Sequence, residues 1–428
     1  MPQPDWDNLY HQHIDCLQAE YAQVLTEQGF DALLISSGAG PLRFGDDQSY
    51  PHHGFGPFLH WTGLAGLEHS WLLIRPDQRP VLYVYSPTDF WHAPPELPEG
   101  IRALLFQIEK HPQAQPPAVE AEHLAVLGDP ALIGRVPGQH NLPALWRALD
   151  RLRIHKSDYE IACLREANAL AAQGHTAARD AFYAGASEFE INLAYQQATA
   201  QREAEAPYHS IIGLNEHAGT LHYQHYNTRA PHKHRALLID AGYRYQGYCS
   251  DITRTYAAPG ENHFQALIQG VEQLQQRLCK AAQPGVDFVE LQDKAHLGIA
   301  ALLGASELVK GMEDGDMVES GLTRTFFPHG LGHFLGVQVH DVGGQPTPPP
   351  ECHPALRLTH TLETGMVVTI EPGLYFIPSL LQDARERGLG DYLNDSLIRE
   401  LQGCGGIRIE DNVVVDDRPD NLTRRLLP

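Results

Sequence analysis

Four carboxylates stand inside apolar, strand-like runs of this chain, and their placement restricts the folds open to it. Asp240 and Asp251 belong to RALLIDAGYRYQGYCSDITRTY, and Glu371 ends the apolar run MVVTIE. In GGIRIEDNVVV, Arg408 and Glu410 share one face of a predicted strand, because side chains alternate between the two faces. An isolated buried charge is strongly unfavourable, so these carboxylates should be paired or metal-bound. We therefore expect the strands to converge on a shared site.

The two aspartates flank a turn that contains a glycine. If the hairpin turns about residues 245 and 246, Asp240 and Asp251 lie opposite each other, with their Cβ atoms about 5 Å apart. Carboxylates at that separation repel each other unless a proton or a cation lies between them. The alternative is that one of the two aspartates faces solvent.

The stretch HGLGHFLGVQVHDVGG, residues 329–344, carries His329, His333 and His340. His333 lies between glycines on one side and Phe334 and Leu335 on the other, which is typical of a tightly packed, desolvated ligand. His329 and His340 can line the same cavity. A single histidine is more often a surface residue or a hydrogen-bonded core residue. The four carboxylates make His333 the candidate metal ligand among the three.

A set of four carboxylates and one imidazole suits two divalent ions such as Mn²⁺, whereas oxygen ligands alone favour Mg²⁺ or Ca²⁺. In two-metal sites the ions lie about 3.5 to 4 Å apart, with a water or hydroxide between them. The residues thus predict a site for two divalent metal ions.

The length of 428 residues favours two domains, because a single hydrophobic core rarely grows to that size. Helical periodicity over residues 8–30, followed by the strand-like runs DALLIS, SWLLIRP and PVLYVYS, predicts a small α/β domain. Prolines recur from 93 to 117 before a long amphipathic helix. We therefore expect domains of residues 1–154 and 155–428.

The second part mixes helices and strands without strict alternation, which favours an α+β fold. Helices are expected around 158–184, 187–205, 261–282 and 287–303, and strands near 235–257, 365–376 and 406–415. Residues 377–404 read as a long, irregular insertion.

Charge and hydropathy argue against two classes of partner. With 53 acidic and 31 basic residues, the formal charge of -22 disfavours nucleic acid and anionic membranes. No apolar run approaches the ~20 residues of a membrane span, and the first residues lack a secretory pattern. The six cysteines show no Cys-x-x-Cys pair, which favours free thiols. We expect a soluble, cytoplasmic protein.

Five positions resemble the metal ligands of the pita-bread metallopeptidases: Asp240, Asp251, His333, Glu371 and Glu410, in DAG, SDITRTY, HGLGHFLG, TIEPGLY and GIRIEDN. Within that superfamily, APYHSIIGLNEHAGTLHY, FFPHGLGHFLGVQVHDVGG and GLYFIPSLL resemble bacterial Xaa-Pro dipeptidases (prolidases), including organophosphorus-hydrolysing members, and the resemblance spans essentially the whole chain. It implies a pita-bread C-terminal catalytic domain and a smaller, ribonuclease H-like α/β N-terminal domain. It also implies a homodimer with two divalent metal ions per subunit, with Mn²⁺ as the expected ion and Co²⁺ or Zn²⁺ as alternatives.

The resemblance also implies an activity, the hydrolysis of Xaa-Pro dipeptides by a hydroxide that bridges the metals. Glu371 would serve as ligand, general base and proton carrier, and His222, in AGTLHYQHY, would stabilise the oxyanion. Arg408 would orient the metal-binding carboxylates. The implied substrate-binding residues are Arg357, His340, Tyr208, His329 and Trp91.

Two of these substrate residues carry particular expectations. Arg357 lies fourteen residues before Glu371, the spacing at which family members carry the arginine that binds the proline carboxylate. Trp91 is expected either near the pocket of a neighbouring subunit or as an aromatic anchor in the core of the small domain.

Some features depart from the family pattern. His360 replaces a second arginine found in several prolidases, and residues 50–60 also differ. An aminopeptidase P, which cleaves longer Xaa-Pro peptides, would share the five ligands. A non-catalytic, peptide-binding pita-bread module would lack bound metal, and a methionine aminopeptidase would usually lack the N-terminal domain.

Overall fold

The computed structural model describes residues 4–427, and the chain forms two compact units. The smaller unit comprises Met1–Cys163 with Tyr245–Tyr248, and the larger one comprises Leu164–Arg244 with Cys249–Pro428. The division falls inside helix α6, Asp158–Tyr183. The domain boundary expected between residues 154 and 155 stays a prediction.

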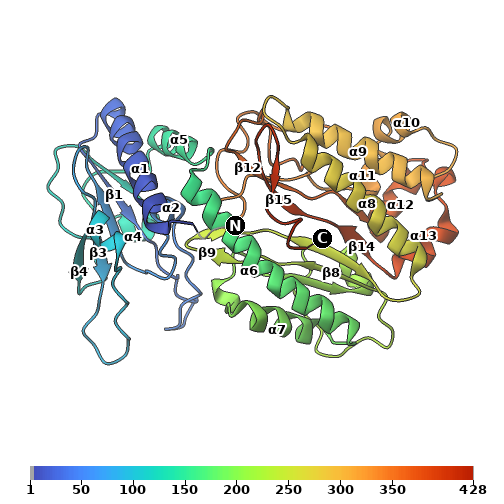
Figure 1. Ribbon diagram of the computed structural model, residues 1–428, viewed down its shortest axis with the longest axis horizontal. Coiled ribbons are helices and arrows are strands. Elements are labelled where there is room, and N and C mark those ends of the chain that lie inside the picture. The colour runs from blue at the N-terminus through green and yellow to red at the C-terminus, as the bar shows by residue number, and fades with distance from the viewer. Residues whose placement is uncertain (1–3, 428) are drawn as a thin grey trace. The chain divides into compact units, whose positions relative to one another are not determined.

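The smaller unit is built on a six-stranded sheet in the order β4-β3-β2-β1-β5-β6 (Figure 1). Strand β1 pairs antiparallel with β2 and parallel with β5, so the sheet is mixed. The central strand β1 is buried along its whole length, which explains its unbroken apolar sequence, whereas the burial of β3 alternates. The α/β character expected for this part of the chain is confirmed. The strands are β1 (Ala32–Ser36), β2 (Trp71–Ile74), β3 (Val81–Tyr85), β4 (Gln107–His111), β5 (Leu124–Leu127) and β6 (Gln139–His140), and the helices are α1 (Trp6–Gln28), α2 (Gly56–Thr62), α3 (Ile101–Leu105), α4 (Pro130–Ile133) and α5 (Pro143–Leu152).

The larger unit holds short antiparallel sheets between two groups of helices (Figure 1). Helix α6 and helix α7 (Glu188–Thr199) pack on the sheet β11-β8-β7 through Phe182, Ile191 and Tyr195. Helix α8 (Asn262–Ala281) contacts β11, β12 and β14. The strands of this part of the chain are β7 (Ile211–Leu214), β8 (Ala236–Asp240), β9 (Arg244–Tyr245), β10 (Tyr248–Cys249), β11 (Thr253–Ala257), β12 (Val367–Ile370), β13 (Gly373–Tyr375), β14 (Gly406–Arg408), β15 (Asp411–Val414) and β16 (Asp420–Asn421). Tyr245 of β9 and Tyr248 of β10 belong to the smaller unit. The expected α+β fold is confirmed.

The expectation of an irregular insertion over 377–404 is wrong. This segment contains helix α12 (Pro378–Glu386), a 3₁₀ turn (Gly390–Tyr392) and helix α13 (Asp395–Gln402). Proline at the first position of α12 and the Asn394 cap of α13 start the two helices, and each buries only a few apolar side chains. Helices this short carry too few periodic apolar residues to be recognised from the pattern alone. The remaining helices are α9 (Phe288–Ala305), α10 (Asp314–Glu319) and α11 (Leu322–Phe326).

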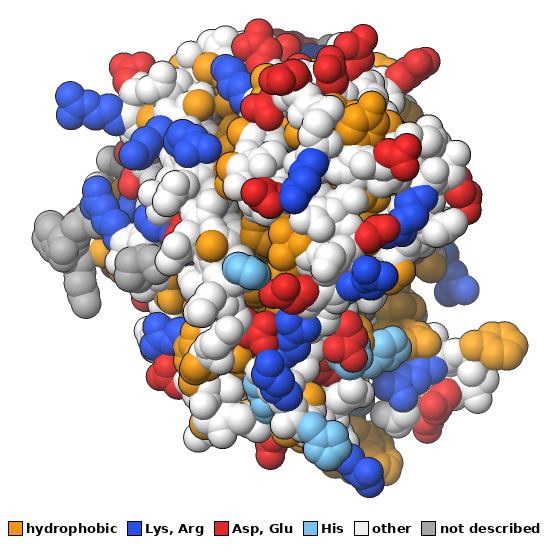
Figure 2. Space-filling model, turned by 90° about the vertical axis from the view of Figure 1, so that its right-hand side faces the viewer, with side chains coloured by type: hydrophobic (Ala, Val, Ile, Leu, Met, Phe, Trp, Pro, Cys, Tyr) orange, Lys and Arg blue, Asp and Glu red, His pale blue; other side chains and the backbone are white. Residues whose placement is uncertain are grey.

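Charged side chains of both signs are interspersed over the face of the molecule seen in Figure 2. Within residues 4–427, no helix is long and apolar enough to cross a membrane.

Candidate metal centre

Strand ends bring the acidic side chains to one cavity of the larger unit. Asp240 ends β8, Asp251 follows β10, Glu371 follows β12, and Glu410 lies between β14 and β15. A backbone bridge between Thr253 and Glu410 joins the two halves of the site. Besides these carboxylates, the cavity is lined by His222, His329, His333, His340, Arg357 and Arg408.

The hairpin that carries the two aspartates is centred one residue later than expected. Asp240 pairs with Thr253 rather than with Asp251. The turn lies at Gln246 and Gly247, whose φ angles of 49° and 88° suit a two-residue hairpin turn. Moving the centre by one residue changes the register by two, which preserves the face that each side chain occupies. Asp251 is therefore a diagonal neighbour of Asp240 on the same face, and both are buried.

Each carboxylate of the cluster except Glu371 has a neutral or cationic hydrogen-bond donor of its own. The Tyr208 hydroxyl donates to Asp251 Oδ1 at 2.6 Å, and Arg408 Nη2 donates to Asp240 Oδ2 at 2.6 Å. The Thr253 hydroxyl donates to Glu410 Oε2 at 2.7 Å. The second oxygen of Asp240, Oδ1, is buried without a hydrogen-bond partner. The donors therefore fix the carboxylates and leave further oxygen atoms available to a ligand.

The orientation of His333 is set by its own backbone neighbourhood. The backbone carbonyl of Phe334 lies 2.9 Å from Nδ1, so Nδ1 carries the proton and donates to it. The other nitrogen, Nε2, lies 3.3 Å from Asp251 Oδ2 and 3.7 Å from Glu371 Oε1. This arrangement points Nε2 at the carboxylates, where it can bind a metal ion once it has lost its proton.

Burial dominates the acid–base properties of the cluster. It raises the pKa of Glu371 to about 7, although the charges of His333 and Arg408 oppose the shift. Burial, and then the charge of Asp251, holds the pKa of Glu410 well above its usual value. Burial also acts to raise the pKa of Asp251, but the hydrogen bond and charge of His333 outweigh it and leave that pKa lowered. Without a cation, the cluster thus disfavours full ionisation.

These residues fit a divalent metal site. Asp251, His333 and Glu410 are buried, and each offers a ligand atom within 4.8 Å of those of the other two. The unpartnered oxygen of Asp240 and the raised pKa of Glu371 are both explained if positive charge normally lies among them. The donor set, carboxylates with one imidazole, is that of borderline divalent ions.

The remaining histidines and Arg357 lie at the wall and rim of the same cavity. His329 Nε2 is 2.9 Å from the Tyr375 hydroxyl, and its Nδ1 is 3.8 Å from Glu371 Oε2. The ring of His340 packs edge-on against His333, with the centroids 4.4 Å apart. His222 and Arg357 are exposed. Arg357 also lines an adjoining recess with Gly343, Gly344 and Gln345, so it borders the space beyond the carboxylates.

Arg408 connects the carboxylates to the wall of the cavity. Its guanidinium donates to Asp240, to the Thr253 hydroxyl at 3.1 Å and to the Tyr375 hydroxyl at 2.9 Å. The side chain is buried, as the alternation of its strand predicts. Arg408 is thereby placed to hold Asp240 and Tyr375 in fixed positions.

Trp91 and His360 lie outside this cavity's lining. Trp91 is 77% exposed in the smaller unit, so the alternative that it anchors the core of that unit is wrong. His360 Nε2 lies 2.7 Å from the backbone carbonyl of Gly343, and its ring packs near Phe334. The structure therefore gives His360 a contact with the loop that lines the recess beside Arg357.

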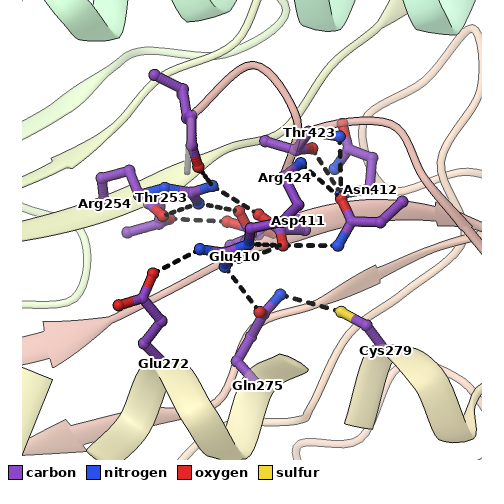
Figure 3. A network of polar contacts seen from close by, with 12 residues as sticks. Thr253, Arg254, Glu272, Gln275, Cys279, Glu410, Asp411, Asn412, Thr423 and Arg424 are labelled. Carbon is purple, nitrogen blue, oxygen red and sulfur yellow. Dashed lines mark hydrogen bonds and ion pairs between the residues drawn. The ribbon is translucent and has the colours of Figure 1, made fainter. Parts of the chain in front are cut away.

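A buried polar network behind the carboxylates was not predicted from the sequence (Figure 3). Arg254 donates to the backbone carbonyl of Glu410 at 2.8 Å and to Asp411 Oδ1 at 2.8 Å. Asn412 bonds to the backbone of Asp251 through both its amide oxygen and its amide nitrogen. The available signal was the run of polar residues directly after Glu410 in a strand that is otherwise apolar. The network fixes the backbone of two candidate ligands.

Comparison with known proteins identifies families for both parts of the chain. Residues 162–417 match the model of metallopeptidase family M24, and residues 8–143 match the model of the Xaa-Pro dipeptidase N-terminal domain. A curated Xaa-Pro dipeptidase from Marinobacter nauticus is 60% identical over 426 residues, which are 99% of both chains. One from Xanthomonas campestris pv. campestris is 42% identical, again over 99% of both.

Solved structures share the fold at lower identity. Aminopeptidase P from E. coli with the inhibitor Pro-Leu superposes with a TM-score of 0.74 at 22% identity, covering 98% of this chain and 95% of that one. Pseudomonas aeruginosa aminopeptidase PepP gives a TM-score of 0.73 at 21% identity, covering 96% of this chain and 95% of the other. The pita-bread fold expected from the sequence is therefore confirmed. The chain matches the family model, aligns with dipeptidase relatives over nearly its whole length and has a cavity that suits divalent ions. It therefore belongs to metallopeptidase family M24.

Proposed function

We propose that this chain is a metal-dependent dipeptidase that hydrolyses Xaa-Pro dipeptides. The observation that carries the proposal is a single cavity that combines the carboxylate and histidine cluster with an exposed arginine, Arg357. The identity of 60% with an Xaa-Pro dipeptidase over the whole chain supports the same substrate class. The aminopeptidase P structures are too distant in sequence, at 22% identity, to favour the longer-peptide alternative.

The metal ions are assigned to Asp240, Asp251, His333, Glu371 and Glu410. We propose two ions per subunit and Mn²⁺ as the native metal, with Co²⁺ and Zn²⁺ as the competing identities. Five ligand residues, four of which can use both oxygens, offer enough donors for two ions but leave room for solvent and substrate. When bound, such ions polarise a substrate carbonyl and lower the pKa of a coordinated water.

Two residues of the chain would act on protons and charge during the reaction. Glu371 accepts a proton from the attacking water on a carboxylate oxygen and delivers it to the leaving proline nitrogen, a transfer that the tertiary amide requires. His222, exposed at the rim of the cavity, donates a ring N–H hydrogen bond to the substrate oxygen that becomes negative. Arg408 keeps Asp240 in place through its 2.6 Å hydrogen bond.

Substrate recognition is assigned to residues around the cavity. The guanidinium of Arg357 pairs with the free carboxylate of the C-terminal proline, which limits the substrate to dipeptides. His340 and His329 line the cavity and are assigned to the bound peptide. Tyr208 is assigned to the same peptide although it does not line the cavity, and its hydroxyl holds Asp251. Trp91, an exposed aromatic in the smaller unit, is assigned to the pocket of a second subunit.

We also propose a homodimer that resides in the cytoplasm, without a polynucleotide or membrane partner. The formal charge of -22 supports the last part, because such a surface repels other polyanions.

The substrate assignment is tested by comparing Ala-Pro with Ala-Pro-Ala at saturating Mn²⁺. A dipeptidase cleaves Ala-Pro and leaves Ala-Pro-Ala essentially intact. Cleavage of the tripeptide at a comparable kcat/KM would instead support an aminopeptidase P activity. The absence of any peptide hydrolysis together with the absence of metal binding would support the peptide-binding module.

A further inference from the structure

One buried carboxylate, that of Glu188, accepts hydrogen bonds from both ends of the loop that carries His222. This loop, residues 214–227 and called the His222 loop below, begins at the end of β7. Glu188, the first residue of α7, is only 1% exposed. Its Oε1 accepts a hydrogen bond from the backbone N–H of Leu214 at 2.9 Å, and its Oε2 accepts one from the backbone N–H of Asn227 at 2.8 Å. The two oxygens therefore hold the two ends of the loop.

Glu188 also binds two side chains within the loop. His217 Nδ1 lies 2.7 Å from Oε1, and the Tyr223 hydroxyl donates to Oε2 at 2.8 Å. The rings of His217 and Tyr223 stack with their centroids 4.4 Å apart. Among residues 4–427, no lysine or arginine lies within ion-pair distance of Glu188. Four hydrogen bonds therefore satisfy a carboxylate that would otherwise be costly to bury.

His222 itself has no comparable anchor. Its side chain is exposed at the rim of the cavity, and within the described residues no hydrogen bond reaches its ring. Its position therefore follows from the backbone of the loop. The next residue, Tyr223, is held by Glu188 and belongs to the same buried apolar cluster as Leu238 and Tyr375.

We propose that Glu188 is a positioning residue for His222, because it fixes the His222 loop at the cavity. The inference rests on the proposed role of His222 in peptide hydrolysis. Glu188 acts through the loop and does not line the cavity. Glutamine cannot replace it: each carboxylate oxygen accepts from a backbone N–H, so a side-chain amide group would face one of these donors in either orientation.

The direct test is hydrogen exchange of the metal-loaded enzyme, comparing Glu188→Gln with the control Glu190→Gln. Glu190 caps the same helix through Ser187, so its loss weakens the start of α7 without removing a bond to the loop. Glu188→Gln should raise amide exchange across the His222 loop by about tenfold or more, as expected for a lost buried hydrogen bond. Glu190→Gln should leave the exchange of the loop unchanged. Unchanged exchange in Glu188→Gln, or an equal rise in the control, would overturn the inference.

Kinetics of Ala-Pro hydrolysis then separates positioning from a general loss of structure. Glu188→Gln should lower kcat about tenfold or more, within the cost of about 10²–10³ for removing one oxyanion donor, with little change in KM or in bound metal. In a His222→Ala background the same substitution should lower kcat little further. Equal losses in both backgrounds would contradict the coupling.

Failure of the proposed function would look different. If His222→Ala leaves kcat unchanged, the catalytic role of His222 is wrong, and the exchange measurement alone decides whether Glu188 fixes the loop. If Glu188→Gln does not fold, Tyr223→Phe tests the inference, because it removes one of the four bonds and keeps the ring. It should produce a smaller rise in loop exchange and a smaller loss of kcat, and the absence of both would overturn the inference.

Discussion

Among single residues, Arg357 has the most specific expected effect. It is exposed at the cavity and borders the adjoining recess, where we propose that it binds the free carboxylate of a dipeptide. A bidentate, charge-assisted pair in a water-poor pocket contributes about 2 to 5 kcal/mol, or roughly 30-fold to several thousand-fold in binding. Arg357→Ala should therefore lower kcat/KM for Ala-Pro by a factor in that range.

Ala-Pro-amide is the matched control for this substitution, because it lacks the carboxylate. Its already slow hydrolysis should change little in Arg357→Ala. Equal losses on both substrates would mean that Arg357 acts on structure or on the metals.

The candidate ligands could be predicted because charge inside apolar runs is conspicuous. Asp251, His333 and Glu410 each offer a ligand atom, and these atoms lie within 4.8 Å of one another. Arg254 and Glu188 could not be predicted in the same way, since each sits in a common sequence context and gains its importance from partners far along the chain. Such long-range pairing is not encoded in local periodicity.

At the scale of secondary-structure elements, the buried ring of His175 in α6 makes the folding stability depend on pH in the acid range. Its Nε2 lies 2.9 Å from the Ala241 carbonyl, and Nδ1 is buried without a hydrogen-bond partner. Burial lowers the pKa of His175 to about 3. Between pH 6.5 and about 3 the unfolded chain binds a proton here that the folded chain does not, so stability falls as the pH falls, by up to about 1.4 kcal/mol per pH unit.

His175→Gln removes this titration and keeps a donor for the Ala241 carbonyl. When the pH is lowered from 7.5 to 4.5, the free energy of unfolding of the variant should fall by about 2 to 3 kcal/mol less than that of the unsubstituted protein. Denaturant unfolding of the metal-free proteins measures this difference. The exposed His232 supplies the control, and His232→Gln should follow the unsubstituted protein. Parallel pH profiles for all three proteins would contradict the assignment.

The main helices and strands follow their sequence patterns, and the exceptions have local causes. The turn at Gln246 and Gly247 moves the hairpin centre by one residue. Its position depends on the two residues that adopt positive φ angles, and hydrophobic alternation does not reveal them. Because the shift changes the register by two, the predicted face of Asp240 and Asp251 survives. Helices α12 and α13 were missed because their short apolar faces give a weak periodic signal.

For the whole molecule, the exposed aromatic pair Phe90 and Trp91 is the feature that a second subunit would explain. Their rings lie 4.6 Å apart and are 86% and 77% exposed. If Trp91 borders the pocket of a partner subunit, Trp91→Ala should raise KM for Ala-Pro by about tenfold, equivalent to about 1.4 kcal/mol. The melting temperature of Trp91→Ala should not change, since the replaced side chain is mostly exposed in the folded subunit.

Phe44→Ala provides a control at another exposed aromatic of the smaller unit. Sedimentation should give a dimer for all three proteins, with KM altered only in Trp91→Ala. A monomeric enzyme with full activity, or a loss of thermal stability without a change in KM, would contradict the role of Trp91.

We propose that a metal centre of carboxylates and His333 performs the hydrolysis, and removal of the metal examines that role. Ala-Pro hydrolysis is measured after chelation and again after Mn²⁺, Co²⁺ or Zn²⁺ is added singly, with bound metal quantified in the same samples. We predict that activity disappears with the metal and that Mn²⁺ restores it best. We also predict that no ion restores it in His333→Ala or Asp251→Asn. Full activity in a demonstrably metal-free sample would show that the hydrolysis does not depend on metal.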